Sequence, residues 1–184
     1  ILAGDALHDL AFELISGNLK NKNNISRLIL INYLSLCIGH KGLALGQALD
    51  LEFENKKLSK KKILDMYSRK TGKLFEFSFS APFILKDKSK KDIQFAKDYG
   101  MLFGLIFQVI DDLIDEIGTF KKIGKTPGKD IAQGKSTLLE LIGEKQVTDF
   151  CKNEINNFTK KHKKKLNQNP ILIKLLEFGM KRIL

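Results

Sequence analysis

Apolar side chains recur along this chain at the three- and four-residue spacing that is typical of amphipathic helices. Clusters of valine or threonine, which would indicate strands, are few, and the chain has only three prolines. No segment repeats at a fixed period, and no linker divides the chain. We therefore expect one all-α domain over residues 1–184, an antiparallel helical bundle with short connections. Helices are predicted over 2–16, 26–53, 59–82, 92–117, 136–144, 146–165 and 171–183.

The predicted helix ends carry residues that suit them. Ser26, Ser59 and Asp92 can each cap a helix N-terminus, and Pro170 suits the start of the last helix. The helix at 2–16 has a single apolar stripe, which predicts that this side faces the core. The stripe consists of Ala3, Leu7, Leu10 and Leu14.

Composition narrows the class of protein. With 43% hydrophobic residues, a chain of 184 residues can form a helical core. Cys37 and Cys151 lie far apart and have no histidine or cysteine at ligand spacing, which excludes a disulfide framework or zinc finger and fits the cytoplasm. The longest apolar stretch, 28–38, is too short to cross a bilayer, so we expect no stable membrane insertion. The chain opens with Ile1, and no signal peptide is expected.

The net charge of +11 comes almost entirely from lysine, since Arg27, Arg69 and Arg182 are the only arginines. Proteins that read nucleic acids use arginine forks for base edges and often place aromatic residues among the basic ones. Neither pattern occurs here. We interpret the lysine runs as solvated helix ends and expect no nucleic-acid partner.

The predicted helix 92–117 carries the clearest chemical signal, the string FQVIDDLID. Its polar residues lie at offsets i, i+3, i+4 and i+7, which places them on one helical face. Three such carboxylates repel one another unless a cation neutralises them, and oxygen ligands without histidine or cysteine suit Mg²⁺. A solvated acidic face is the alternative. The residues are Gln108, Asp111, Asp112 and Asp115.

A segment rich in lysine and glycine, residues 118–135, follows directly. Its lysines can neutralise an anion, and its glycines allow backbone N–H groups to approach one. Together with the aspartates, this segment predicts a diphosphate held through Mg²⁺. The lysines concerned are Lys125, Lys129 and Lys135.

Two earlier helices offer further candidates. Lys70 and Thr71 lie within an otherwise apolar run, where they would be costly without a polar partner, so we interpret them as site residues. Gln47 and Asp50 lie on one face of the predicted helix 26–53, which is equally consistent with an exposed face or a site wall.

Five strings, in this order and spacing, resemble the C-terminal half of the trans-isoprenyl diphosphate synthase family, which includes the farnesyl and geranylgeranyl diphosphate synthases. They are ILAGDAL, GQALDLE, KTGKLFE, FQVIDDLID and GKTPGKDIAQGKST. The resemblance implies the class I terpenoid synthase fold, here lacking its N-terminal helices. It also implies a homodimer and head-to-tail condensation of an allylic diphosphate (dimethylallyl or geranyl diphosphate) with isopentenyl diphosphate, giving a short-chain product.

The resemblance also implies roles for individual residues. Asp111, Asp112 and Asp115 would bind diphosphate through Mg²⁺, three ions per full site with one held from this segment. Lys125 and Lys135 would contact the allylic diphosphate, and Asp130 would lie near the water shell of the metal. The residues that would flank the reacting carbon are Lys70, Thr71 and Gln108.

One large departure from the family is expected. The first aspartate-rich motif and the isopentenyl diphosphate pocket belong before ILAGDAL, so this chain is predicted to be a fragment that is inactive alone. A non-catalytic partner subunit that binds isoprenyl diphosphate and a class I terpene cyclase are the alternatives.

Overall fold

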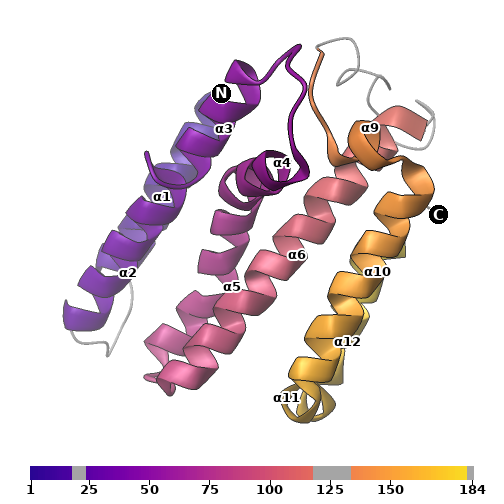
Figure 1. Cartoon of the computed structure of the whole chain (residues 1–184). Helices are drawn as coiled ribbons and strands as arrows, with labels where there is room; N and C mark the ends of the chain where they lie inside the picture. The colour runs from indigo at the N-terminus through magenta and orange to yellow at the C-terminus, as the bar shows by residue number, and fades with distance from the viewer. Residues whose placement is uncertain (18–23, 118–133, 182–184) are drawn as a thin grey trace.

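We describe the protein from a computed structural model, which defines the positions of residues 1–17, 24–117 and 134–181. Every regular element in these ranges is a helix, as the periodicity predicts (Figure 1). In chain order they are α1 (Leu2–Gly17), α2 (Asn24–Ile38), α3 (Leu43–Glu52), α4 (Lys60–Tyr67), a π-helical turn η1 (Ser68–Gly72), α5 (Lys73–Leu85), α6 (Lys90–Ile117), α9 (Leu138–Ile142), α10 (Glu144–Lys161), α11 (Lys163–Gln168) and α12 (Pro170–Lys181).

Helix α6 is the centre of the bundle, with α5 on one side and α10 and α12 on the other (Figure 1). It buries residues at the spacing of one helical face, because that face packs against several neighbours at once. The core around it draws on α4, α9, α10 and α12. Its fully buried members include Ile63, Ile106, Ile110, Leu113, Leu138, Val147 and Leu176.

The prediction of a single helix over 26–53 is wrong, because the chain turns between α2 and α3. Gly42 explains the turn: a Cβ atom there would lie 1.9 Å from the carbonyl oxygen of Cys37. Ser26 is also not a cap, since α2 begins at Asn24 and Ser26 is buried within it. The turn allows α3 to leave the direction of α2 and approach η1.

The other predicted boundaries hold in part. Ser59 precedes α4 as expected, but its side chain makes no capping hydrogen bond. The helix predicted to end near Pro82 continues to Leu85 with the proline inside it. Helix α6 is capped by Ser89 rather than by Asp92, because the Ser89 hydroxyl accepts the Asp92 amide N–H at 3.2 Å. Pro170 opens α12 as predicted, whereas 146–165 divides into α10 and α11.

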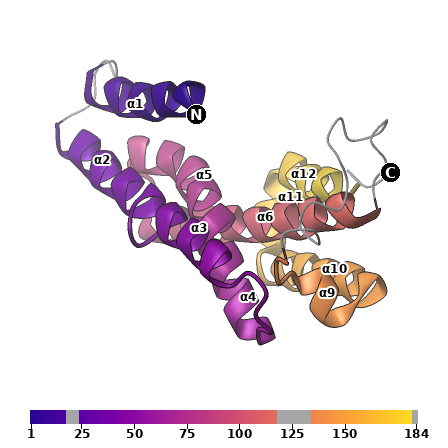
Figure 2. The same cartoon turned by 90° about the horizontal axis from the view of Figure 1, so that it is seen from above.

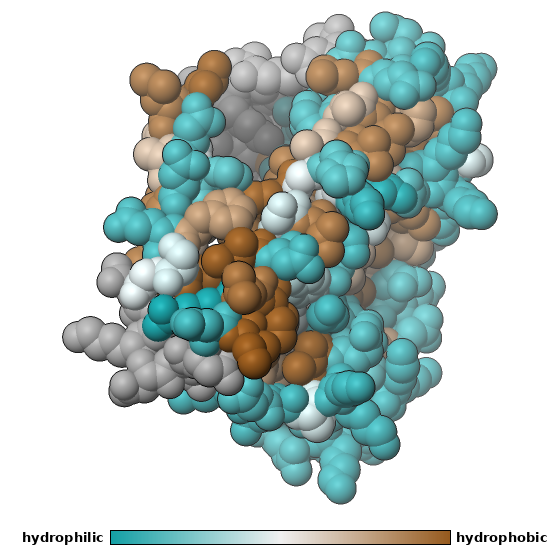
Figure 3. All heavy atoms as spheres, turned by 90° about the vertical axis from the view of Figure 1, so that its left-hand side faces the viewer, coloured by the Kyte–Doolittle hydropathy of each residue, from teal (hydrophilic) through white to brown (hydrophobic). Residues whose placement is uncertain are grey.

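Helix α1 does not face a core within the described part of the chain, which corrects the prediction. None of its residues is buried, and Leu7 is 67% exposed. The helix packs mainly against α2 and lies at the edge of the bundle (Figure 2). Apolar side chains gather on the face of the molecule on which α1, α2 and α3 lie (Figure 3). Several large apolar residues of the first two helices are exposed: Leu2, Leu7, Leu10, Leu14, Ile25, Leu28, Ile29 and Leu36.

Both cysteines are free and buried, as expected for a chain without disulfides. Burial raises the pKa of the Cys37 thiol to about 11, so this thiol stays protonated near neutral pH. A position in the cytoplasm stays a prediction.

The run Asn24–Glu52 contains an 18-residue window with a mean hydropathy of 1.5 and is long enough to cross a membrane by length and composition alone. The sequence-based prediction concerned the shorter stretch 28–38, which lies within this run. In the structure the run is divided into helices of 15 and 10 residues, each shorter than the about 20 residues that a bilayer requires. The absence of stable membrane insertion stays a prediction.

Candidate active site

Three helical segments meet at unusually short distances beside the aspartate stripe. A Cβ atom on Gly46 of α3 would lie 2.1 Å from the backbone nitrogen of Lys70 in η1. A Cβ atom on Gly104 of α6 would lie 2.8 Å from the Cα of Gly72. Glycine therefore lets α3 and α6 approach η1 from two sides. The π-helical turn is itself a feature that is frequent at functional sites.

Lys70 is held by a carboxylate of α3. Its ammonium donates to Asp50 Oδ2 at 2.5 Å, with the lysine side chain 23% exposed and the aspartate side chain 7% exposed. The partner that a buried lysine requires is thus provided by the protein itself. Asp50 belongs to the wall of the site, whereas Gln47, the neighbouring candidate, is exposed on α3.

The other candidates of η1 and α6 form a hydrogen-bonded chain. Thr71 Oγ1 donates to Gln108 Oε1 at 2.5 Å, and Gln108 Nε2 donates to Asp112 Oδ1 at 2.8 Å. The Tyr67 hydroxyl donates to the second oxygen of Asp112. Two helices thereby fix the orientation of one carboxylate.

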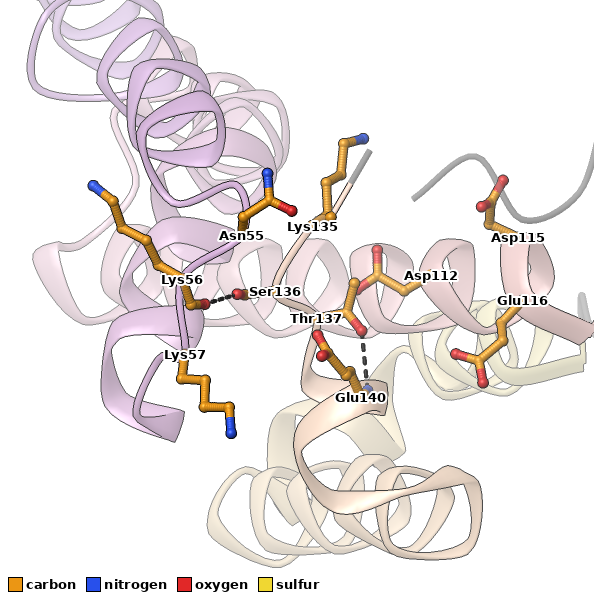
Figure 4. A pocket seen from close by; sticks show the side chains of 11 residues that line it. Asn55, Lys56, Lys57, Asp112, Asp115, Glu116, Lys135, Ser136, Thr137 and Glu140 are labelled. Carbon is orange, nitrogen blue, oxygen red and sulfur yellow. Dashed lines mark hydrogen bonds between the residues drawn. The ribbon is translucent and has the colours of Figure 1, made fainter. Parts of the chain in front are cut away.

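The aspartate stripe borders a cavity of about 420 Å³. Asp112 and Asp115 are 5% and 3% exposed and line it, so the alternative of a solvated acidic face is wrong for these two (Figure 4). Asp111 is half-buried on α6. A cavity of roughly 300–1,000 Å³ is typical of small-molecule sites.

The opposite wall is the segment before α9. Lys135, Ser136 and Thr137 line the cavity across from Asp112 (Figure 4). The backbone N–H of Asn55 donates to the Gly134 carbonyl at 2.7 Å, and the Ser136 hydroxyl donates to the Lys56 carbonyl. Gly134 has a φ of +64°, which favours glycine, and a Cβ atom there would lie 2.1 Å from Asn55 Oδ1 and would displace that side chain. The loop at 53–57 thus fixes the segment that carries Lys135.

A second cavity, of about 20 Å³, lies among Asp50, Tyr67, Lys70 and Gln108. It shares lining residues with the larger cavity, namely Asp112, Lys135, Ser136 and Thr137. The structure therefore brings Lys70 and Gln108 to the same region as the buried aspartates. The remaining predicted residues, Lys125, Lys129 and Asp130, lie outside the described residues.

Two residues of the site do not follow from the sequence pattern. Tyr67 has the spacing of a core residue, and Asn55 lies in a lysine-rich loop. Their roles depend on partners that are distant in the sequence: Leu138 for Tyr67 and Gly134 for Asn55. The only local signal is the turn-forming character of asparagine, which tolerates the φ of 59° that Asn55 adopts.

Within 1–17, 24–117 and 134–181, no three carboxylate, histidine or cysteine side chains are gathered closely enough to hold a metal by themselves. Mg²⁺ is commonly held by one or two carboxylates together with water and substrate phosphates. The fold and site thus define a helical-bundle protein in which buried aspartates and a lysine line one cavity.

The particular family follows from comparison with known proteins. The chain belongs to the polyprenyl synthetase family, whose pattern it matches over residues 1–176. It is 36% identical over 166 residues to a short chain isoprenyl diphosphate synthase of Methanocaldococcus jannaschii, covering 81% of this chain and 49% of that one. It is also 36% identical over 153 residues to a farnesyl diphosphate synthase of Bacillus subtilis, covering 81% of this chain and 52% of the relative.

The fold is also that of solved relatives. A geranyltransferase from Helicobacter pylori, crystallised with magnesium and isoprenyl diphosphate, superposes with a TM-score of 0.81 at 29% identity. That comparison covers 97% of this chain and 58% of the other. The predicted isoprenoid synthase fold is thus confirmed, and the chain spans about half the length of the curated relatives that it matches.

Proposed function

We propose that the full-length protein is a short-chain trans-prenyltransferase. It condenses an allylic diphosphate (dimethylallyl or geranyl diphosphate) with isopentenyl diphosphate head to tail, giving farnesyl or geranylgeranyl diphosphate. The observation that carries the proposal is that buried Asp112 and Asp115 face a cavity also lined by Lys135. The family supports this reading, since its named relatives include synthases of both products.

Asp111, Asp112 and Asp115 are the residues that would hold Mg²⁺, with diphosphate oxygens and water completing its ligands. When bound, the ion supplies Lewis-acid stabilisation of charge on the departing diphosphate. We propose one ion held from this segment, of three in the full site. The cavity of about 420 Å³ leaves room for the diphosphate beside the carboxylates.

Lysines and dipoles of the chain supply the other contributions. Lys135 is positioned to neutralise diphosphate oxygens, and we assign the same task to Lys125 and Lys129. Thr71 and Gln108, already hydrogen-bonded to each other, direct their dipoles at the carbon that becomes positive as the diphosphate leaves. We place Lys70 beside the same carbon, and Asp130 near the metal-bound water.

The isopentenyl diphosphate pocket and the first aspartate-rich motif are assigned to the part of the family that these 184 residues do not cover. We also propose a homodimer, because α1 and α2 expose a long apolar surface that needs a partner.

Replacing Asp111 tests the proposal. In the full-length protein, Asp111→Ala should lower turnover by about 100-fold or more with the fold intact, because one anionic ligand is lost. Pyrophosphate release with both substrates is the measurement, and Asp149→Ala, which changes an exposed aspartate of α10, is the control. An unchanged rate in Asp111→Ala would remove this residue from the site.

The same assay separates the alternatives. A class I terpene cyclase would turn over farnesyl diphosphate without isopentenyl diphosphate. A non-catalytic partner subunit would bind both substrates and release no pyrophosphate. Condensation that requires both substrates supports the transferase.

A further inference from the structure

A buried tyrosine connects the aspartate stripe to the start of α9. Tyr67, the last residue of α4, is only 2% exposed. Its hydroxyl donates to Asp112 Oδ2 and accepts the backbone N–H of Leu138 at 2.9 Å. One phenol oxygen thus joins three segments that are far apart in the sequence.

The two partners of this hydroxyl belong to segments on opposite sides of the cavity: Asp112 lines it, and Leu138 directly follows Thr137, which also lines it. Asp112 lies on α6, and its other oxygen is held by Gln108. Leu138 follows Lys135 by three residues, in the segment that lines the facing wall. A bond from a neutral donor to a carboxylate is charge-assisted and directional, and a buried aromatic ring has few alternative rotamers.

We propose that Tyr67 is a positioning residue, which sets the Asp112 carboxylate and the Lys135 segment at a fixed separation. Its action on the reaction rests on the proposed function, in which that separation must match a magnesium diphosphate. The Asn55 and Ser136 hydrogen bonds fix the Lys135 segment to the loop at 53–57. Tyr67 fixes it to the carboxylates.

Tyr67→Phe in the full-length protein removes the hydroxyl and keeps the ring. We expect kcat to fall by about 10-fold or more, as for one hydrogen bond to a charged group. The Mg²⁺ concentration for half-maximal rate should rise several-fold. The KM for isopentenyl diphosphate, which binds elsewhere in the proposed site, should stay within about two-fold of wild type.

Tyr99→Phe is a matched control. Tyr99 is 1% exposed, and its hydroxyl donates to the Leu172 carbonyl at 2.7 Å, at the opposite end of α6 from the aspartates. Both variants lose one buried hydroxyl, so both should lose comparable stability to denaturant. Only Tyr67→Phe should change the Mg²⁺ dependence. An equal effect in the two variants would overturn the proposal.

A measurement without turnover separates this inference from the proposed function. Amide hydrogen exchange at Leu138 should be at least about 10-fold faster in Tyr67→Phe than in wild type, and unchanged in Tyr99→Phe. If the wild-type protein were inactive but the variants showed this exchange pattern, the proposed transferase activity would be disproved. The proposal that Tyr67 joins Asp112 to the Leu138 segment would still hold. If exchange at Leu138 were unchanged in Tyr67→Phe, the proposal that the Tyr67 hydroxyl holds the Leu138 segment would be disproved.

Variants of Asp112 provide a second test should Tyr67→Phe fail to fold. Asp112→Asn keeps an oxygen that accepts from Tyr67, whereas Asp112→Leu does not. Protection of the Leu138 amide should therefore persist in Asp112→Asn and decrease in Asp112→Leu. Equal protection in both would contradict the proposal.

Discussion

Charged side chains of the site are held by partners on neighbouring helices. Lys70 and Asp50 come from segments 20 residues apart and meet at 2.5 Å. Because Asp50 is almost fully buried, its carboxylate depends on this ammonium for compensation. Removing one partner of the pair should therefore cost stability, because the other charge stays buried.

Lys70→Met should lower the free energy of unfolding of the full-length protein by about 2 kcal/mol, because it leaves a buried carboxylate without its cation. Adding Asp50→Asn should recover more than half of that loss, since the uncompensated charge is then gone. Urea denaturation of wild type, both single variants and the double variant measures the coupling. Strictly additive losses would show that the pair contributes no stability.

Site residues could be predicted from the sequence where charged side chains stand at an unusual spacing or in an apolar run. The aspartates at offsets i, i+1 and i+4 stand out in any helix, and the lysine of an apolar run requires a partner. Tyr67 could not be found this way, because a tyrosine at core spacing looks like any other core residue. Its role depends on an amide 71 residues away.

The sequence predicted the presence of helices better than the places where they are interrupted. Periodicity identified the helical class and the long central helix, but it could not locate the turn at Gly39–Gly42 or the π-helical turn at Ser68–Gly72. At Gly39 and Gly42 the close contacts are with nearby carbonyl oxygens of Ser35 and Cys37, whereas the π-helical turn is approached by Gly46 and Gly104, which are distant in the sequence. Glycines in an apolar run indicated such approach without identifying the partner.

Gly46→Ala tests the contact between α3 and η1. Its Cβ atom would lie 2.1 Å from the Lys70 nitrogen, so the two backbones must separate. We expect a loss of about 3 kcal/mol in the free energy of unfolding, together with lower activity because η1 carries Lys70 and Thr71.

Gly4→Ala is the control for that variant. Gly4 also lies within a helix, but apart from the adjoining backbone of that helix no described atom lies within 4 Å of the position of its Cβ. Alanine there should stabilise the protein by about 0.5–1 kcal/mol through helix propensity alone. Thermal denaturation of both variants, side by side, measures the difference. Similar melting temperatures would contradict the close approach seen at Gly46.

At the scale of the whole molecule, two features are incomplete within the described residues: the burial of α1 and the set of metal ligands. Helix α1 has no buried residue, and no three metal-binding side chains meet. The sequence pattern predicted that Asp111, Asp112 and Asp115 hold one ion, which stays a prediction, and it assigned α1 to a core, which is wrong within the described residues. Periodicity shows that a helix has an apolar side, but not which chain covers it.

The 184-residue chain by itself should therefore fold its central bundle without catalysing the reaction. The core around α6 joins residues of α4, α9, α10 and α12, so circular dichroism should show a helical protein with a cooperative melt. With Mg²⁺ and both substrates, it should release no pyrophosphate, because the proposed carboxylates and isopentenyl diphosphate pocket of the other half are absent. The full-length protein, assayed in parallel, is the positive control. Measurable pyrophosphate release by the shorter chain would show that half of the family's length suffices for the chemistry.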